Sequence, residues 1–158
     1  MNTQTRDKAL QQFPYALLIV GSTMGDSVVA IVGNWATQVS FSPALVAVSI
    51  ERDSRMRQFI ETSGFFSINL LPSKRTELAK TFLKPREASA NSINGRKFAR
   101  AKNGTPFLHD ALSSIECKVI QMYPTGDHVT FIGEISDAVV HRDGEALTLR
   151  ETGLRYQR

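Results

Sequence analysis

The sequence predicts a mainly β protein, folded as a closed barrel or a sandwich and flanked by two or more short helices. Two observations lead to this class. Most apolar and β-branched residues fall in runs of strand length, and only two segments repeat apolar residues at helical spacing. A chain of 158 residues also predicts a single domain, residues 1–158. The predicted strands are residues 15–23, 27–35, 44–50, 65–71, 114–123, 128–140 and 145–151.

Turn and proline signals separate these strands. Residues 24–26, Met-Gly-Asp, fit a hairpin turn between the first two strands. Pro43 precedes the third strand and Pro72 follows the fourth, because proline cannot donate a hydrogen bond within a strand ladder. The second strand is nearly continuous in β-branched residues, so we expect both of its faces to be covered.

Two segments are predicted to be helices. The first runs from Ser54 to Gly64, with Asp53 or Ser54 as its N-cap and Gly64 as its stop signal. The second is residues 74–84, which Pro85 follows.

Residues 86–105 are polar and contain several asparagines and glycines. Such a composition is typical of a loop rather than of a regular element. We therefore expect a long surface excursion here, of a kind that is often functional or mobile.

Composition and charge argue against several classes of protein. Cys117 is the only cysteine, so no intramolecular disulfide can form, and a reduced cytoplasmic setting fits. No apolar run approaches the ~20 residues of a membrane-spanning helix. The net charge of +4 favours anionic partners, but lysines and arginines are scattered, so no nucleic-acid partner is expected. The three histidines lack paired spacing, so no metal site is predicted.

The first candidate site is the stretch of residues 32–43, where small and polar residues interrupt a β-branched run. These residues are Gly33, Asn34, Ala36, Thr37 and Gln38. A strand interior avoids such residues unless its backbone must approach something closely. A flat ligand lying on exposed backbone would explain the pattern, and so would a bulge or a barrel corner.

The second candidate site is the junction between the strand ending near residue 50 and the first helix. Serines and arginines gather there; they are Ser49, Arg52, Ser54, Arg55 and Arg57. A helix N-terminus with added guanidinium groups is suited to a phosphate. Ordinary helix capping with solvated arginines would give the same pattern.

The third candidate is the pair of titratable residues Asp127 and His128, which opens an apolar strand after a turn. A neighbouring carboxylate favours the cationic form of a histidine, which suits an anionic or electron-rich ligand. A turn aspartate that bonds its own backbone, beside an idle histidine, is the alternative. The sequence contains no recognisable nucleophile–base spacing, so no side chain is assigned as catalytic.

Taken together, these stretches resemble the flavin reductase family, whose fold is the FMN-binding split β-barrel of Greek-key type. No single motif carries the resemblance, but their order and spacing do, over nearly the whole chain. The matching segments are residues 39–46, 63–71, 78–82, 104–112, 115–117 and 126–128.

The resemblance implies positions for a flavin. Its ring would lie against the strand that carries small residues, and its ribityl chain would pass the end of the next strand. The residues implied for the ring are Gly33, Asn34, Trp35, Ala36 and Thr37, and those for the ribityl chain are Ser49, Ile50 and Glu51.

The resemblance also implies the surroundings of these two groups. Ser54 and Arg57 would meet the flavin phosphate, and Phe82 would close one side of the site. His128 would lie near the nicotinamide of a second nucleotide.

The function implied by the resemblance is hydride transfer from NADH or NADPH to FMN, with FAD as the alternative flavin. The flavin carries the chemistry and the protein positions it. The resemblance further implies a homodimer that covers its exposed strand edges. It could be the reductase component of a two-component flavin-dependent monooxygenase, or could pass electrons to another acceptor.

Three other functions are weighed against this one. The first is an FMN-binding electron carrier without its own NAD(P)H step. The second is an oxidase on the same barrel, acting on a small amine such as a pyridoxine phosphate, for which too few basic residues gather at one site. The third is a basic β-barrel that binds nucleic acid, which would need aromatics alternating with Lys or Arg on one strand face.

Overall fold

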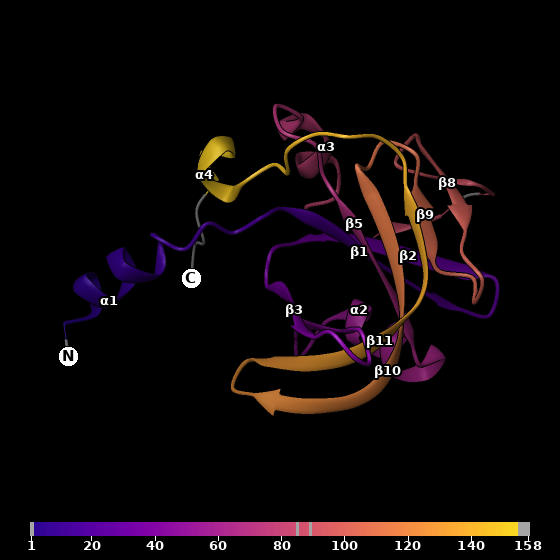
Figure 1. The fold of residues 1–158 in the computed structure, drawn as a ribbon, viewed down its shortest axis with the longest axis horizontal. Coiled ribbons are helices and arrows are strands. Elements are labelled where there is room, and N and C mark those ends of the chain that lie inside the picture. The colour runs from indigo at the N-terminus through magenta and orange to yellow at the C-terminus, as the bar shows by residue number, and fades with distance from the viewer. Residues whose placement is uncertain (1, 85, 89, 155–158) are drawn as a thin grey trace.

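The computed structural model describes residues 2–84, 86–88 and 90–154, so Pro85 lies outside the described residues. Its largest element is an antiparallel sheet with the strand order β3-β4-β11-β10-β5-β1-β2-β6 (Figure 1). The strands of this sheet are β1 (Leu18–Met24), β2 (Ser27–Gly33), β3 (Ala36–Ser40), β4 (Leu45–Glu51), β5 (Phe65–Leu70), β6 (Arg86–Glu87), β10 (Ser113–Thr125) and β11 (His128–Val140). The mainly β class predicted from the sequence is confirmed.

A smaller sheet and short helices accompany the large sheet. The small sheet has the order β7-β8-β9, made of β7 (Ser92–Ile93), β8 (Arg96–Arg100) and β9 (Pro106–Leu108). The helices are α1 (Thr3–Leu10), α2 (Arg55–Ser63), α3 (Thr76–Thr81) and α4 (Leu149–Thr152). None of the helices in the described ranges is long and apolar enough to cross a membrane.

The large sheet is rolled around one apolar cluster. Strands β1, β2, β4, β5, β10 and β11 all contribute buried side chains to it, and α2 adds Met56, Phe59 and Ile60. Within the described part of the chain the end strands β3 and β6 are not paired with each other, so the rolled sheet stays open at one seam.

A second apolar cluster covers the opposite face of β1 and β2. Leu18 and Val20 of β1 point into the first cluster, whereas Ile19 points into the second. On β2, Val29 belongs to the first cluster, and Val28 and Ala30 belong to the second. The prediction that residues 27–35 are covered on both faces is therefore confirmed for β2, because side chains alternate between faces along a strand.

Helix α2 forms as its sequence signals predict. The Ser54 hydroxyl accepts a hydrogen bond from the Arg57 N–H at 3.1 Å, so Ser54 rather than Asp53 is the N-cap. Gly64 ends the helix at φ 76°, a backbone conformation that glycine adopts without strain. The first turn of α2 is thereby fixed directly after the end of β4.

The prediction of a strand at residues 145–151 is wrong. Only two isolated bridges form there, Ala146 with Pro72 and Thr148 with Ala16. The chain then turns into α4, because the Thr148 hydroxyl caps the Glu151 N–H and so favours a helical turn.

Residues 86–105 are more regular than the predicted surface excursion. They form β6, β7 and β8, and they bury Ile93 and Phe98 in the second cluster. These apolar side chains lie among polar residues, so the local composition hides their contribution to the core. Three further elements were not predicted: α1, β9, and β3, which follows the strand predicted at residues 27–35.

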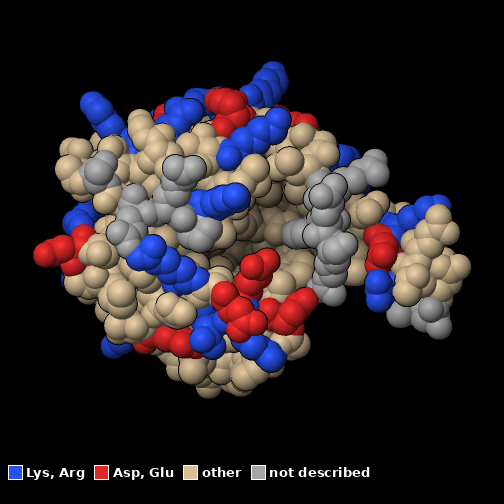
Figure 2. Space-filling model, turned by 180° about the vertical axis from the view of Figure 1, so that it is seen from behind, with Lys and Arg blue, Asp and Glu red and all other residues tan. Residues whose placement is uncertain are grey.

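Charged side chains are spread over the surface. On the face seen in Figure 2, basic side chains occur around the whole outline, and acidic side chains gather beside a central hollow. This distribution agrees with the scattered basic residues of the sequence.

Buried polar groups in the barrel wall are well satisfied. The Glu116 carboxylate is fully buried and accepts hydrogen bonds from the Thr105 hydroxyl at 2.6 Å and the Asn103 N–H at 3.0 Å. Beside it, burial and the Glu116 charge raise the pKa of the Cys117 thiol to about 12, so this thiol stays protonated at neutral pH. A side chain at Gly133 could not fit, because its Cβ would lie 2.6 Å from that of Cys117.

A buried hydrogen-bond chain leads from the wall to the surface. The Ser114 hydroxyl donates to the Asn69 side-chain oxygen at 2.7 Å and contacts His141 Nε2 at 3.0 Å. Since the one hydroxyl hydrogen is used, His141 Nε2 must carry its own hydrogen. Burial, followed by the charges of His109 and Arg142, lowers the pKa of His141 and favours its neutral form.

Asn69 joins four strands through its amide. Its Nδ2 donates to the carbonyls of Ile19 at 3.2 Å and Pro106 at 3.1 Å. Its Oδ1 accepts from the Leu108 N–H at 2.8 Å and from the Ser114 hydroxyl. The side chain is completely buried, so these groups cannot turn to water instead.

We expect Asn69→Ala to lower the free energy of unfolding by about 2–4 kcal/mol, because it leaves several buried groups without partners. Urea unfolding followed by circular dichroism measures the change. The exposed Asn91→Ala is the matched control and should change it by less than about 0.5 kcal/mol. Equal stability of the two variants would contradict the role given to Asn69.

Candidate functional site

Three segments that are far apart in the sequence meet at the end of β4. Strand β4 pairs with β11, and their last pair is Glu51 with His128. Two pairs along, the Ser49 hydroxyl lies 2.8 Å from the Thr130 hydroxyl. The Ser49 N–H donates to the Trp35 carbonyl at 2.9 Å, which adds the connection between β2 and β3. The three candidate sites predicted from the sequence therefore lie next to one another.

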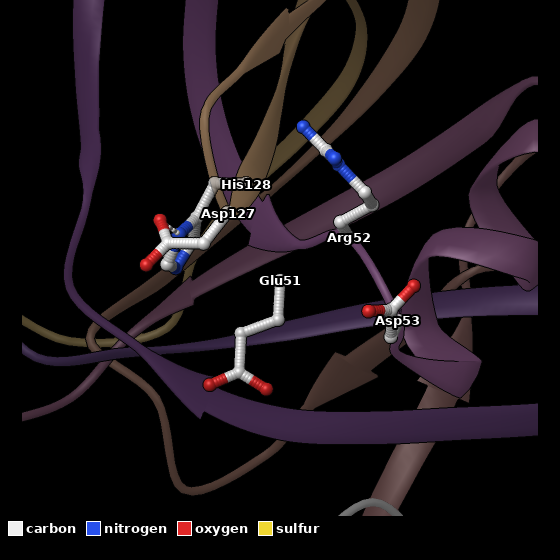
Figure 3. A pocket seen from close by; sticks show the side chains of 5 residues that line it. All are labelled: Glu51, Arg52, Asp53, Asp127 and His128. Atoms are coloured by element: carbon white, nitrogen blue, oxygen red, sulfur yellow. Dashed lines mark hydrogen bonds and ion pairs between the residues drawn. The ribbon is translucent and has the colours of Figure 1, made fainter. Parts of the chain in front are cut away.

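A pocket of about 220 Å³ lies at this meeting point. Its lining residues are Glu51, Arg52, Asp53, Asp127 and His128 (Figure 3). The Asp127 carboxylate is turned toward the imidazole of His128, and the Arg52 guanidinium points away from the other two carboxylates. In the described part of the chain, no group of three or more His, Cys, Asp or Glu side chains is placed so that it could hold a metal ion.

His128 is held on two sides. Its Nδ1 lies 2.7 Å from the Asp127 carboxylate, so Nδ1 carries a hydrogen and Nε2 is left for another partner. Its ring centroid lies 4.6 Å from that of Trp35, with the ring planes at 48°. The Asp127 side chain is 59% exposed and that of His128 is 18% exposed. The pair thus presents an oriented imidazole at the edge of the pocket.

The start of α2 adjoins the same pocket through Ser54. The Ser54 hydroxyl donates to the Glu51 carbonyl at 2.7 Å and accepts from the Arg57 N–H. The capping alternative considered for this junction is therefore present. Arg57 Nη1 lies 3.7 Å from the Glu61 carboxylate, one helical turn further on.

Two buried donors near the pocket have no hydrogen-bond partner among the described residues. They are Asn34 Nδ2 and Arg57 Nε. A buried donor without an acceptor costs about 1–3 kcal/mol, and more when it is charged. An amide nitrogen and a guanidinium nitrogen both suit an acceptor such as a ring carbonyl or a phosphate oxygen. The donor set therefore fits a ligand rich in acceptors, as a flavin nucleotide is.

The connection between β2 and β3 is a barrel corner. Gly33 ends β2, Asn34 and Trp35 follow, and Ala36 begins β3, which lies at the other end of the strand order. A Cβ on Gly33 would lie 3.4 Å from the nearest atom, an ordinary contact, so core packing alone does not require glycine here. The corner alternative is confirmed, and the flavin contact at these residues stays a prediction.

The remaining predicted site residues divide into two groups. Ala36 and Thr37 begin β3, where they pair with β4 beside the pocket, and Ile50 is buried in the first cluster. Phe82 is not brought to the pocket: its side chain is completely buried in the second cluster. Only its carbonyl reaches β2, where it accepts from the Val32 N–H at 2.9 Å.

Arg52 and Asp53 both line the pocket. From the sequence, Arg52 belonged to the candidate phosphate site without an individual role, and Asp53 was considered only as a cap. The signal in the sequence was that both residues closely follow the end of a predicted strand. Whether residues in that position line a pocket depends on which turn lies opposite them, and local sequence does not reveal this.

Comparison with known proteins identifies the family. Residues 10–157 match the sequence model described as "Flavin reductase like domain". The chain belongs to this family. The resemblance inferred from motif order is thereby confirmed.

Two relatives illustrate the range of this family. NADH-dependent FMN reductase AsuE2 of Streptomyces nodosus subsp. asukaensis is 28% identical over 159 residues, which covers 91% of this chain and 83% of that protein. Diflavin flavoprotein A 1 of Synechocystis sp. is 29% identical over 143 residues. The aligned residues cover 90% of this chain and 25% of that protein. The chain thus spans about a quarter of the diflavin flavoproteins that it matches.

A solved structure supports the same fold for this flavin reductase-like chain. BorF, the flavin reductase component of a bacterial two-component tryptophan halogenase, matches with a TM-score of 0.82. The match covers 96% of this chain and 95% of that chain, at 24% identity. At that identity the likeness concerns the arrangement of the strands and helices.

Proposed function

We propose that this protein binds FMN or FAD and reduces it with NADH or NADPH. The observation that carries the proposal is the pair of partnerless buried donors, Asn34 Nδ2 and Arg57 Nε, beside the His128 pocket of a flavin reductase-like chain. The relative AsuE2, which is named as an NADH-dependent FMN reductase and is covered over most of its length, supports this activity.

The chain's own residues would hold the flavin by hydrogen bonding and charge. Asn34 Nδ2 would donate to a ring acceptor, and Arg57 would donate to the phosphate at the first turn of α2, where the helix dipole also favours an anion. Ser49 and Glu51 on the last part of β4 would flank the chain between ring and phosphate. The bound flavin would supply the ring that accepts a hydride from the nicotinamide.

His128 would act on the nicotinamide nucleotide by binding rather than by proton transfer. Asp127 holds the imidazole by Nδ1, which leaves Nε2 for a contact with the dinucleotide. Trp35 packs against the same ring and keeps it from turning. A hydride step requires orientation and close approach and needs no general base, so these residues would contribute by positioning.

An electron-carrier role without an NAD(P)H step is the second candidate function. It is favoured by the match to diflavin flavoproteins, in which the corresponding segment is only about a quarter of the protein. In that arrangement the flavin of this domain would exchange electrons with other parts of a longer chain. The same pocket would then hold the flavin with no dinucleotide beside it.

An oxygenase partner in the cytoplasm fits the reductase proposal. BorF is named as the reductase component of a two-component halogenase, and its fold is that of this chain. We propose that the described chain acts as one domain and that reduced flavin, or its electrons, pass to such a partner. Cytoplasmic location is part of the proposal, because nicotinamide cofactors are supplied there.

Purified protein mixed with NADH or NADPH and FMN or FAD tests the proposed activity. We expect loss of nicotinamide absorbance at ~340 nm at a rate that saturates with the concentration of each substrate. Flavin binding without nicotinamide oxidation would support the carrier instead. Absence of flavin binding would contradict both functions.

The variant Arg57→Met tests the phosphate contact within the same assay. We expect the FMN dissociation constant to rise about 10- to 100-fold, because a charge-assisted hydrogen bond contributes about 1.5–3 kcal/mol. Arg55→Met is the matched control, since it removes the same charge from a side chain that lies over the Phe59 ring. An equal loss of affinity in both variants would attribute binding to general charge rather than to Arg57.

His128→Ala tests the nicotinamide contact. Stopped-flow reduction of bound flavin should need roughly ten times more nicotinamide for half-saturation, which is the loss of about 1.4 kcal/mol of binding. The limiting rate should change little, because His128 is not given a part in the chemical step. The exposed His109→Ala is the control. An unchanged concentration dependence in His128→Ala would remove His128 from the site.

We also propose a homodimer that covers the outer half of β10. Strand β5 pairs with β10 only up to Lys118, so the edge beyond that residue has no strand neighbour on that side in the described ranges. Ile120 and Met122, in this part of β10, are 45% and 54% exposed. Exposed apolar strand edges are commonly covered by another chain.

Met122→Lys should shift the protein toward the monomer in analytical ultracentrifugation, because a lysine ammonium loses its hydration in an apolar interface. Gln121→Lys places the same charge on the opposite face of the strand and is the control. A monomer in the unaltered protein would contradict this proposal.

A further inference from the structure

Arg52 connects the turn that carries His128 to the body of the protein. The turn joins β10 to β11 across Gly126 and Asp127. The Arg52 N–H donates to the Asp127 carbonyl at 2.9 Å, and the Arg52 guanidinium donates through Nη2 to the Gly126 carbonyl. One side chain and its own backbone therefore hold two successive carbonyls of the turn.

The turn lies at the tip of a three-stranded segment, in which β11 lies between β4 and β10. The last pairs are Glu51 with His128 and Thr125 with His128, so Gly126 and Asp127 are outside the strand pairing. In the described part of the chain, the two bonds from Arg52 lie directly beyond these pairs. They hold the turn where strand pairing no longer does.

The carbonyl that Arg52 holds belongs to the residue that sets the turn. Gly126 has φ 77°, a left-handed conformation that directs the chain from β10 back into β11. A hydrogen bond from a guanidinium is stronger than one from a neutral donor, so it restrains the carbonyl of this turn effectively. Asp127 and His128 follow immediately, and their orientation depends on this peptide.

We infer that Arg52 is a positioning residue for His128. By holding the Gly126–Asp127 peptides against the end of β4, it keeps the imidazole packed on Trp35 and directed into the pocket. Arg52 acts through the turn and needs no contact with a ligand. The inference about the turn stands on geometry alone, and its consequence for nicotinamide binding rests on the proposed function.

The charged groups around His128 come from two elements. Asp127 belongs to the turn itself, and the junction of β4 with α2 supplies Glu51, Arg52 and Asp53. Removing the Arg52 charge therefore changes the local field as well as the hydrogen bonds. Arg52→Lys separates the two effects, because it keeps the charge and retains one donor group for the Gly126 carbonyl.

Trp35 provides a readout that does not depend on activity. It is the only tryptophan of the chain, and its ring lies 4.6 Å from that of His128. Contact with an imidazole alters indole fluorescence, so His128→Gln at constant pH should change the Trp35 emission intensity and so measure the contribution of the contact. The measurement is made without added flavin or nicotinamide.

Arg52→Ala should reproduce at least half of that change, because the released imidazole no longer stays against Trp35. Arg52→Lys should show little of it. Arg100→Ala is the matched control, since the Arg100 guanidinium also donates to a hairpin-turn carbonyl, that of Asp26 at 2.7 Å, away from the pocket. This control should keep the emission of the unaltered protein. Unchanged emission in Arg52→Ala, with folding verified by circular dichroism, would overturn the inference.

A second measurement links the turn to the proposed activity. Arg52→Ala should raise the nicotinamide KM about five- to tenfold with little change in kcat, and should leave the FMN dissociation constant within about twofold. An unchanged KM together with a changed Trp35 emission would overturn the link to nicotinamide and leave the positioning intact. If the unaltered protein does not oxidise NADH or NADPH, the proposed function fails and the fluorescence measurement alone decides the role of Arg52. If Arg52→Ala does not fold, Arg52→Gln decides it by the same two measurements.

Discussion

The antiparallel pairing of β4 with β11 is the constraint on which the candidate site depends. It runs from Leu45 with Glu134 to Glu51 with His128, and its last pair sets the imidazole beside the junction that leads into α2. Cross-strand pairing fixes such neighbours because a slip of one residue would turn every side chain to the opposite face. The apolar side chains of β4 and β11 point into the first cluster, so the register of the site is protected by burial.

The barrel wall and the site differ in how completely their buried polar groups are hydrogen-bonded. In the wall, Asn69 and Glu116 are completely buried, and neighbouring donors and acceptors surround each of them. Beside the pocket, Asn34 and Arg57 each leave a buried nitrogen without a partner among the described residues. A folded protein satisfies nearly all of its buried polar groups, so exceptions call for an explanation. A bound molecule rich in acceptors explains both nitrogens at once, and the family of the chain makes a flavin nucleotide the natural choice.

The same arrangement serves either function proposed for this domain. Flavin held by the β2–β3 corner and the start of α2 would leave the His128 side of the pocket open. A dinucleotide could enter there in a reductase, as the relative AsuE2 suggests, whereas another part of a longer chain could approach in a diflavin protein. The turn that presents His128 is a small, separately anchored unit, so the choice between the two functions could be made there without altering the barrel.

The sequence by itself determined most strands of the large sheet and helix α2, and only the tertiary structure decided how they meet. Local chemistry determines the strand runs, the hairpin turn at Gly25 and the caps of α2. These features depend on side-chain branching, backbone freedom and hydrogen bonds between residues close in sequence. The strand expected at residues 145–151 did not form, because a strand needs the edge of another strand to pair with. Only two single bridges form there before Thr148 starts a helix.

The site shows the same division. Gly33, Asn34, Arg57 and His128 stood out in the sequence as unusual residues for their positions. The burial of Phe82 away from the pocket and the bonds from Arg52 to the turn depend on contacts between distant segments. Local residues cannot specify such contacts, because only the packing of the whole sheet determines which segments become neighbours.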